Sequence, residues 1–352
     1  MVGELAPVEV DFQSAGADFW KRYHAYRRVR HTESRPDDPL RPDDVEELRL
    51  KRDSPFDINY RYEIARDGVL LSWFWGSTGK PGTPGYESNR HLFWGDLYVR
   101  PDHRRQHIGA SWLPIVLELM DRHGCTVAGF EAEEVSGHAF LKWIGAEAKL
   151  TGAENRLKIA DVDWSLVKRW IDEGTERSSQ TRLEVYDGPM PDAMLDDFAP
   201  QLTNMLKTIP FENLDIGEIL VTPDHIRDWD ERSALTGVLQ HTVLTREPDG
   251  VISAITDTSW DPSRPTIIEQ RFTGVRPDAR GRGLGKWIKA KMLAHIHELY
   301  PMAEWVVTDN AGSNAPMLAI NTKLGFKQYR EGTEYQISRD ALAARRRALT
   351  AT

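Results

Sequence analysis

A short segment rich in glycine and arginine is the part of the sequence best suited to chemistry. Residues 280–286 read Arg-Gly-Arg-Gly-Leu-Gly-Lys, after a stretch that predicts a strand and before residues with the spacing of an amphipathic helix. N–H groups at a helix N-terminus, together with the helix dipole, attract anions. Glycines let phosphate oxygens approach the backbone, here at Gly283 and Gly285. Positive charge comes from three side chains: Arg280, Arg282 and Lys286. The segment therefore predicts a phosphate-binding loop.

Two familiar phosphate motifs do not fit this loop. The chain has no Gly-x-x-x-x-Gly-Lys-Ser/Thr, and the glycine spacing of residues 281–285 is not that of the dinucleotide fingerprint. From the loop alone, a glycine-rich turn followed by a solvated basic helix start remains an equal alternative.

An internal repeat gives the chain a two-part organisation. Val-Arg-Pro-Asp occurs at Val99 and again at Val275, at an offset of 176 residues. Further on, Ile-Gly-Ala around Gly145 is echoed by Leu-Gly-Phe around Gly325, at an offset of 180 residues. Two matched blocks in the same order at similar offsets indicate tandem domains of one fold. A polar stretch after the helix predicted for residues 163–175 places the boundary between domains 1–177 and 178–352.

Each half predicts the same succession of strands and helices. A first strand (8–12; 183–186) is followed by helical stretches (18–30; 192–207) and then by a hairpin, which is clearest at 238–256. Another strand (91–99; 267–275), the glycine-containing turn, a helix, a strand (126–130; 305–308) and a short helix complete each half. In the second half, the helix after the turn carries an apolar stripe: Ile288, Met292, Ile296 and Leu299. Such intermixing predicts an α/β (α+β) fold with a mixed sheet.

Three blocks resemble the GCN5-related N-acetyltransferase (GNAT) superfamily. Arg280 to Gly285 is similar to its acyl-CoA signature, the strand ending in Val275-Arg276-Pro277 to its fourth strand, and Thr308 to Phe326 to its next block. The resemblance covers residues 181–338 and, more weakly, the first half, as in tandem GNAT proteins such as mycothiol synthase. It implies two domains, each with a mixed, mostly antiparallel sheet flanked by helices. It also implies that acetyl-CoA is bound by Thr273, Val275, Arg280, Gly281, Arg282, Gly283, Leu284, Gly285, Lys286, Asn310 and Asn314.

The resemblance further implies an N-acetyltransferase that moves an acetyl group from acetyl-CoA to a primary amine of a small molecule, by direct attack in a ternary complex. Histone-acetylating members carry a catalytic Glu where this chain has Glu269, which would deprotonate the amine. Many members use a Tyr as the general acid, but Asn321 stands at that place, so the acid is unassigned. A protein or peptide acetyltransferase and a non-catalytic acyl-CoA-binding sensor or scaffold remain alternatives.

The two halves are expected to be unequal. By the 176-residue offset, Phe93 stands where the second half has Glu269, and His107 stands where it has Gly283. A side chain at the loop position would crowd a pyrophosphate. The second half is therefore the expected catalyst. The first is a degenerate domain with a possible second acyl-CoA site formed by Val99, Arg104, Arg105, Ile108, Gly109 and Ala110.

Composition and charge exclude several classes of protein. The net charge of −9 argues against a general nucleic-acid binder, and no apolar run reaches the ~20 residues that span a bilayer. The start of the chain lacks the pattern of a secretory signal, so a cytoplasmic protein is expected. The one cysteine, Cys125, is expected in the core, and His295 and His297, two apart on a helix, do not form a metal pair. We expect no metal, a small-molecule amine as partner, and a monomer or homodimer.

Overall fold

The computed structural model describes residues 6–350 and divides into two compact units. Unit 1 comprises residues up to 151, residues 213–218 and residues from 332 onward. Unit 2 comprises residues 152–212 and 219–331. In the described residues, no helix has the length and apolar character needed to cross a membrane.

The sheet of unit 1 has the strand order β1-β2-β3-β4-β5-β12. Neighbouring strands are antiparallel except β4 and β5, which run parallel. The strands are β1 (Val8–Glu9), β2 (Asp57–Arg66), β3 (Val69–Gly79), β4 (Leu92–Val99), β5 (Val127–Ala132) and β12 (Lys327–Ser338). The helices are α1 (Ala17–Ser34), α2 (Asp43–Lys51), α3 (Tyr86–Asn89), α4 (Leu113–His123), α5 (Val135–Ile144) and α11 (Arg339–Thr350), with 3₁₀ turns η1 (Pro101–His103) and η2 (Ala110–Trp112).

The sheet of unit 2 has the strand order β6-β11-β10-β9-β8-β7, and only β10 and β11 are parallel. The strands are β6 (Glu147–Lys158), β7 (Arg182–Asp187), β8 (Leu239–Arg246), β9 (Ile252–Trp260), β10 (Ile267–Val275) and β11 (Trp305–Ala311). The helices are α6 (Trp164–Arg177), α7 (Leu195–Leu206), α8 (Pro223–Leu235), α9 (Leu284–Leu299) and α10 (Ala315–Leu324), with η3 (Ile159–Asp161), η4 (Asp192–Met194) and η5 (Pro277–Ala279). The predicted mixed, mostly antiparallel sheets flanked by helices are therefore confirmed.

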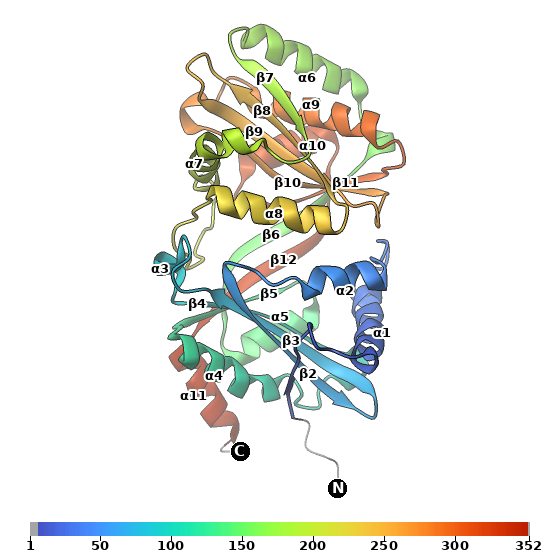
Figure 1. Ribbon diagram of the computed structural model, residues 1–352, viewed down its shortest axis with the longest axis vertical. Helices are drawn as coiled ribbons and strands as arrows, with labels where there is room; N and C mark the ends of the chain where they lie inside the picture. Colours follow the sequence, from blue (N-terminus) through green and yellow to red (C-terminus); the bar gives the residue numbers. More distant parts are fainter. Residues whose placement is uncertain (1–5, 351–352) are drawn as a thin grey trace. The chain divides into compact units, whose positions relative to one another are not determined.

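Alternation along the strands gives each sheet two buried faces. In unit 2, Val243 and Ala254 pack toward α9, while their neighbours Leu244 and Ile255 pack toward α7. Figure 1 shows α6 running beside α9 on one face of this sheet. Of the predicted apolar stripe, Ile288, Met292 and Ile296 are buried, whereas Leu299 at the end of α9 is 43% exposed.

The last strand of each sequence repeat completes the sheet of the other unit. Residues 152–158 of β6 pair with β11 in unit 2, and residues 333–338 of β12 pair with β5 in unit 1. The helices that follow these strands go with them, so α6 belongs to unit 2 and α11 to unit 1. The boundary between residues 177 and 178 stays a prediction about the repeat, because the compact units are not continuous segments; the ends of the predicted domains, 1–5 and 351–352, lie outside the described residues.

Candidate functional site

The parallel strand pair of each unit separates partway along its length. In unit 2, β10 pairs with β11 only from Ile267 to Glu269, although β9 accompanies β10 to Val275. In unit 1, β4 pairs with β5 only from Leu92 to Gly95. Beyond these points, backbone groups on that side of β10 and β4 have no strand partner and are available to a ligand. We call the place where each pair separates the divergence point.

The loop between β10 and α9 has the backbone of an anion site. Gly281 and Gly283 have φ angles of +82° and +84°. Within residues 6–350, no backbone carbonyl accepts a hydrogen bond from the N–H groups of residues 281–285. A Cβ added to Gly281 would meet nothing within 4 Å, and one added to Gly283 only the Arg177 guanidinium at 3.8 Å. The loop therefore offers open space beside unsatisfied N–H groups at a helix N-terminus, and it fits a pyrophosphate.

The basic side chains of this loop differ in their availability. Arg280 is exposed, and its Nε donates to the Val275 carbonyl at 3.3 Å. Arg282 is engaged by Glu247 at 2.9 Å and by the Thr181 hydroxyl at 2.7 Å. The Lys286 Nζ lies 5.5 Å from the centre of the Trp170 ring. Arg280 and Lys286 are thus the loop cations left for a phosphate, whereas Arg282 holds the loop to Glu247, just after strand β8, and to Thr181.

Two other predicted loop residues contribute through their backbone. The Leu284 side chain is 1% exposed and belongs to the core. A Cβ on Gly285 would lie 3.3 Å from Ile320 and 3.4 Å from Val275. The absence of a side chain at Gly285 therefore lets α9 begin close to the end of β10.

Helix α6 places an unpredicted arginine beside the loop. Arg177 pairs with Glu173 at 3.5 Å and approaches Gly283 as described above. The helix packs closely here, because a Cβ on Gly174 would lie 2.2 Å from Trp287. A small cavity at this contact is lined by Trp170, Glu173, Gly174, Arg177, Arg282, Gly283 and Lys286. The sequence analysis missed Arg177 because α6 lies in the first sequence repeat, and nothing in that repeat signals the exchange of its end into unit 2.

The predicted asparagines form part of the framework near β11. Asn314 caps α10, its side chain accepting from the Met317 N–H at 3.4 Å. The Asn310 Oδ1 accepts from the Asn321 amide at 2.7 Å and from the Asn155 amide at 3.3 Å. Asn321, at the place of the family's tyrosine, is 2% exposed. This buried amide is bound within the protein and cannot serve as a proton donor to a leaving group.

Glu269 is the last residue of β10 that pairs with β11, so it lies at the divergence point. Its Oε1 accepts from the Arg264 Nη2 at 2.5 Å, and its side chain is 46% exposed. Burial alone would lower the pKa of Arg264, but Glu269 and Asp261 hold that pKa above its ordinary value. Arg271 pairs instead with Asp257 at 2.8 Å. The structure thus provides an accessible carboxylate at the place where the sequence analysis puts the base.

Polar side chains fill the interior beside this divergence point. Gln270 donates to the Thr256 hydroxyl at 2.8 Å, which lies 2.8 Å from the Thr273 hydroxyl. Lys289 is 2% exposed and lines a cavity of about 10 Å³ with Gln270 and Thr258. Within the described part of the chain, no carboxylate pairs with its Nζ, and burial lowers the pKa of Lys289 to about 7. Sequence analysis missed this lysine, since its position on an amphipathic helix carries no signal of function.

The loop of unit 1 has the same backbone with different side chains. Arg105 and His107 have φ angles of +63° and +61°, matching Gly281 and Gly283. In residues 6–350, no backbone carbonyl accepts from the N–H groups of residues 105–109 either. The Ile108 side chain is buried, and Ala110 donates its N–H to the His107 carbonyl at 3.0 Å. A Cβ on Gly109 would meet the Phe140 ring at 2.9 Å.

The counterpart of Glu269 in unit 1 is Trp94, and the prediction of Phe93 is wrong by one residue. Trp94 pairs with Ser77 on β3 and with Gly129 on β5, as Glu269 pairs with Ser259 on β9 and Val307 on β11. A bulge between Gln270 and Phe272 inserts one extra residue into β10. A constant offset taken from the strand end therefore misaligns the strand start. Neither aromatic residue can act as a base.

Two further expectations concern cysteine and metals. Cys125 is 3% exposed, and burial raises the pKa of its thiol, so the prediction of a core residue is confirmed. His295 and His297 form no metal pair, as predicted, since His297 stacks on Trp164; His295 instead lies near His241 and Asp187, a grouping that the sequence analysis did not foresee. The sequence analysis compared only histidines close in sequence, whereas the fold joins residues from two strands and a helix.

Comparisons with known proteins find acetyltransferases among the chains that this one resembles. Residues 20–145 match the model of the family described as "Acetyltransferase (GNAT) family". A curated relative, the mycothiol acetyltransferase of Saccharomonospora viridis, is 31% identical over 98 residues. That match covers 26% of this chain and 31% of the relative, so the chain spans about a third of the relative's length. The family model matches the first sequence repeat, which the sequence analysis regards as the weaker of the two.

Solved structures resemble the whole chain. A tandem GNAT protein from the clavulanic acid biosynthesis pathway has a TM-score of 0.72 at 17% identity, covering 96% of this chain and 99% of its own. A GCN5-related N-acetyltransferase from Sphaerobacter thermophilus has a TM-score of 0.63 at 11% identity, covering 95% and 96%. At these identities the likeness shows the fold, and it shows it over both units.

Proposed function

We propose that this chain, a tandem member of the GNAT family, is an acetyl-CoA-dependent N-acetyltransferase whose reaction takes place in unit 2. The observation that carries the proposal is the joint position of three features on β10. The strand separates from β11 at Glu269, its free backbone runs to Val275, and the loop with open N–H groups follows directly. This arrangement fits a long ligand with a diphosphate at one end and a reactive group at the other.

The loop residues bind the diphosphate. The N–H groups of residues 281–285 donate to its oxygens, and Arg280 and Lys286 balance its charge, with Arg177 approaching from α6. The backbone of residues 270–275, which pairs with β9 but no longer with β11, binds the amide-containing arm on its unpaired side. The buried Asn310–Asn321 pair keeps β11 and α10 in place on the other side of the opening.

At the divergence point, groups of the chain accept the proton of the amine and stabilise the negative charge that develops on the thioester oxygen. Acetyl-CoA supplies an activated acetyl group as a thioester. Glu269 accepts the proton of the acceptor ammonium, directly or through water, which gives the nitrogen its nucleophilic lone pair. A backbone N–H at the free end of β10 stabilises charge on the carbonyl oxygen. Cys125 is buried in unit 1 and takes no part, so the acceptor attacks directly in a ternary complex.

The acceptor we propose is a primary amine on a small molecule. Two similar proteins support this class: a mycothiol acetyltransferase, and a glucosamine N-acetyltransferase region that matches with a TM-score of 0.62 at 11% identity. The residues beside Glu269 are mainly charged: Asp257, Asp261, Arg264 and Arg271. Such a mixture suits a polar, amine-bearing compound.

Unit 1 is proposed as a possible second acetyl-CoA site without transfer. It keeps the two left-handed loop residues and the open N–H groups, and the family model matches it. It lacks a base at the position that matches Glu269, since Trp94 stands there.

The test is thiol release from acetyl-CoA with a panel of amines. We expect turnover with at least one small primary amine and no faster reaction with peptide or protein amines. Turnover only with peptides would replace the acceptor class. Tight acetyl-CoA binding without release of thiol for any amine would favour a non-catalytic sensor or scaffold. That alternative is suggested by Asn321, which stands where many family members have the tyrosine that acts as general acid.

A further inference from the structure

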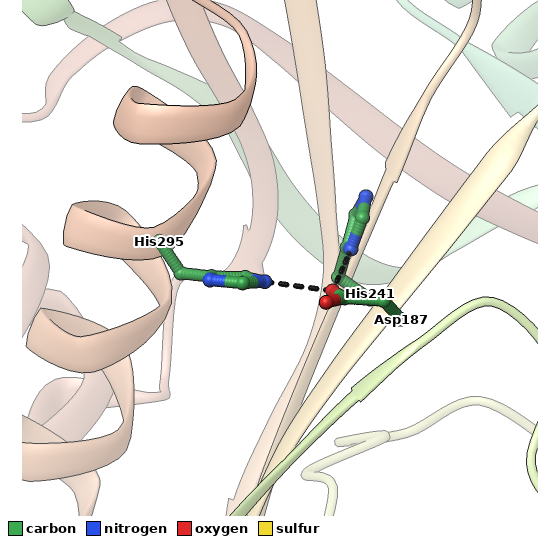
Figure 2. A group of neighbouring side chains, drawn as sticks. All are labelled: Asp187, His241 and His295. Atoms are coloured by element: carbon green, nitrogen blue, oxygen red, sulfur yellow. Dashed lines mark hydrogen bonds and ion pairs between the residues drawn. The ribbon is translucent and has the colours of Figure 1, made fainter.

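Three side chains far apart in sequence converge on one point in unit 2, away from the acetyl-CoA loop. They are Asp187 at the end of β7, His241 on β8 and His295 on α9. Figure 2 shows both imidazole rings directed at the same carboxylate. The Asp187 Oδ1 lies 2.6 Å from the His241 Nδ1 and 2.7 Å from the His295 Nε2. One atom of each residue lies within 4.8 Å of the other two.

These ligand types and their arrangement suit a divalent transition-metal ion. Zn²⁺ binds imidazole nitrogen and carboxylate oxygen at about 2.0–2.2 Å. Two imidazole nitrogens already point to a common place, where the carboxylate oxygen lies in the metal-free protein. The Asp187 side chain is 54% exposed and the His295 side chain 16% exposed. The carboxylate can therefore withdraw toward solvent, and water can occupy a remaining coordination position.

A second contact orients the buried histidine for this task. The His241 Nε2 lies 2.6 Å from the Tyr300 hydroxyl, and the Tyr300 ring stacks on Trp260 with centres 4.5 Å apart. In the metal-free protein the Nδ1–H donates to the Asp187 carboxylate and the Tyr300 hydroxyl donates to Nε2. With an ion on Nδ1, the ring proton would lie on Nε2 and be donated to the Tyr300 oxygen. A fixed partner on the second ring nitrogen is a regular feature of metal-binding histidines.

We propose that Asp187, His241 and His295 form a binding site for a first-row divalent transition-metal ion such as Zn²⁺, with water completing the coordination. The site joins the edge strand β7 to helix α9. His295 lies 11 residues after Leu284, the start of α9, which at 1.5 Å per residue is about 16 Å along the helix. The ion would therefore lie away from the loop of residues 280–286 and would stabilise the contact of β7 with α9, and the inference does not depend on the proposed function.

The test is calorimetric titration of the metal-stripped full chain with Zn²⁺, together with Co²⁺ absorption spectra. We expect one Zn²⁺ per chain, Co²⁺ bands typical of low coordination, and a higher melting temperature with Zn²⁺. His295→Gln should weaken binding at least tenfold. His297→Gln is the matched control, since it changes a histidine two residues further along α9 that stacks on Trp164; this variant should bind normally.

Asp187→Asn provides a second variant if His295→Gln does not fold, because this side chain is exposed and the change preserves its shape. It should also lose affinity at least tenfold. Two results would overturn the proposal: absence of Zn²⁺ binding by the folded chain, or unchanged affinity in both His295→Gln and Asp187→Asn. In either case the three residues would form only a hydrogen-bonded group.

Discussion

The loop between β10 and α9 of unit 2 and the matching loop after β4 of unit 1 share one backbone conformation and differ in charge. Residues 105 and 107 in unit 1 and residues 281 and 283 in unit 2 all have positive φ, but only unit 2 has glycine there. Arg104 donates to the Val99 carbonyl at 3.0 Å, as Arg280 does to Val275. In unit 1, however, Glu33 neutralises Arg104 with two contacts of 2.7 Å. The comparison teaches that the loop backbone can keep its conformation when a carboxylate of the same unit neutralises the arginine that could otherwise bind a phosphate.

The interiors beside the two divergence points differ even more. The strand registers give the equivalent positions in the two units. Phe74 of unit 1 corresponds to Thr256 of unit 2, Gly95 to Gln270, and Phe130 to Thr308. In unit 1 the rings occupy the space, since a Cβ on Gly95 would lie 2.6 Å from Phe130 and one on Gly76 would lie 2.4 Å from Phe93. Unit 2 instead places hydroxyl and amide groups there. The aromatic packing in unit 1 suits stability. The polar interior of unit 2 agrees with the proposal that acetyl transfer takes place there and not in unit 1.

The largest effect is expected from removing the base in unit 2. Glu269→Gln keeps the size of the side chain but removes the basic oxygen, so kcat should fall by ~10²–10⁴-fold with little change in acetyl-CoA affinity. Steady-state kinetics at saturating amine and calorimetry check this. The matched control is Glu298→Gln, at an exposed position on α9. If Glu269→Gln turned over like the wild type, the base would have to be another group.

The second effect concerns the buried amine that only unit 2 has. The folded-state pKa of Lys289, about 7, lies below its ordinary 10.5. Between these values the unfolded chain holds a proton that the folded chain lacks, so wild-type stability rises with pH across this window. Lys289→Met should therefore stabilise the protein most at pH 7 and below. The gain should fall by up to ~1.4 kcal/mol per pH unit toward pH 10.5.

Urea unfolding at pH 7 and pH 9 measures this difference. Leu113→Met in unit 1 is the control, because Leu113 is the buried residue at the matching helix position. Its effect should not depend on pH. An equal gain for Lys289→Met at both pH values would show that the folded protein keeps Lys289 protonated up to pH 9, so that its pKa is not lowered.

A third variant tests the loop of unit 2 directly. Gly283→Asp brings a carboxylate and a Cβ into the open space of the loop, so acetyl-CoA affinity should fall at least tenfold, ~1.4 kcal/mol. Gly250→Asp is the control for backbone strain, because Gly250 also has a positive φ, +90°, in the β8–β9 turn. Calorimetry on both folded variants gives the result. If Gly283→Asp and Gly250→Asp bound acetyl-CoA with equal affinity, the loop of unit 2 would not be part of the binding site.

The smallest effect is expected in the loop of unit 1. A residue other than glycine pays about 1 kcal/mol for a left-handed backbone. His107→Gly should therefore stabilise the protein by up to about that amount, measured by urea unfolding. Gly124→Ala, at a helix end with φ +67° and open space, makes the reverse change and should destabilise. A loss of stability in His107→Gly would mean that the imidazole makes favourable contacts.

Much of the local structure could be predicted from the sequence, but the exchange of the last strand and helix between the two repeats could not. The strand at 267–275 and the loop after it could be predicted, because apolar alternation and glycine spacing are local signals. The assignment of β6 and α6 to unit 2 could not, because the segments have the same pattern whichever sheet they join. The bulge at Gln270 shifted the alignment of Phe93, since a repeat offset assumes equal strand lengths. The partners of His295 depend on tertiary packing alone.

The central claim, that transfer belongs to unit 2, is tested most directly by placing the same residue at the same position of both loops. Gly283→Asp and His107→Asp each put aspartate at the second left-handed residue of a loop. Acetyl-CoA turnover with a reactive amine is then measured for both, at confirmed folding. We predict that Gly283→Asp loses nearly all turnover and that His107→Asp keeps most of it. Equal losses in the two variants, or a greater loss in His107→Asp, would contradict the account.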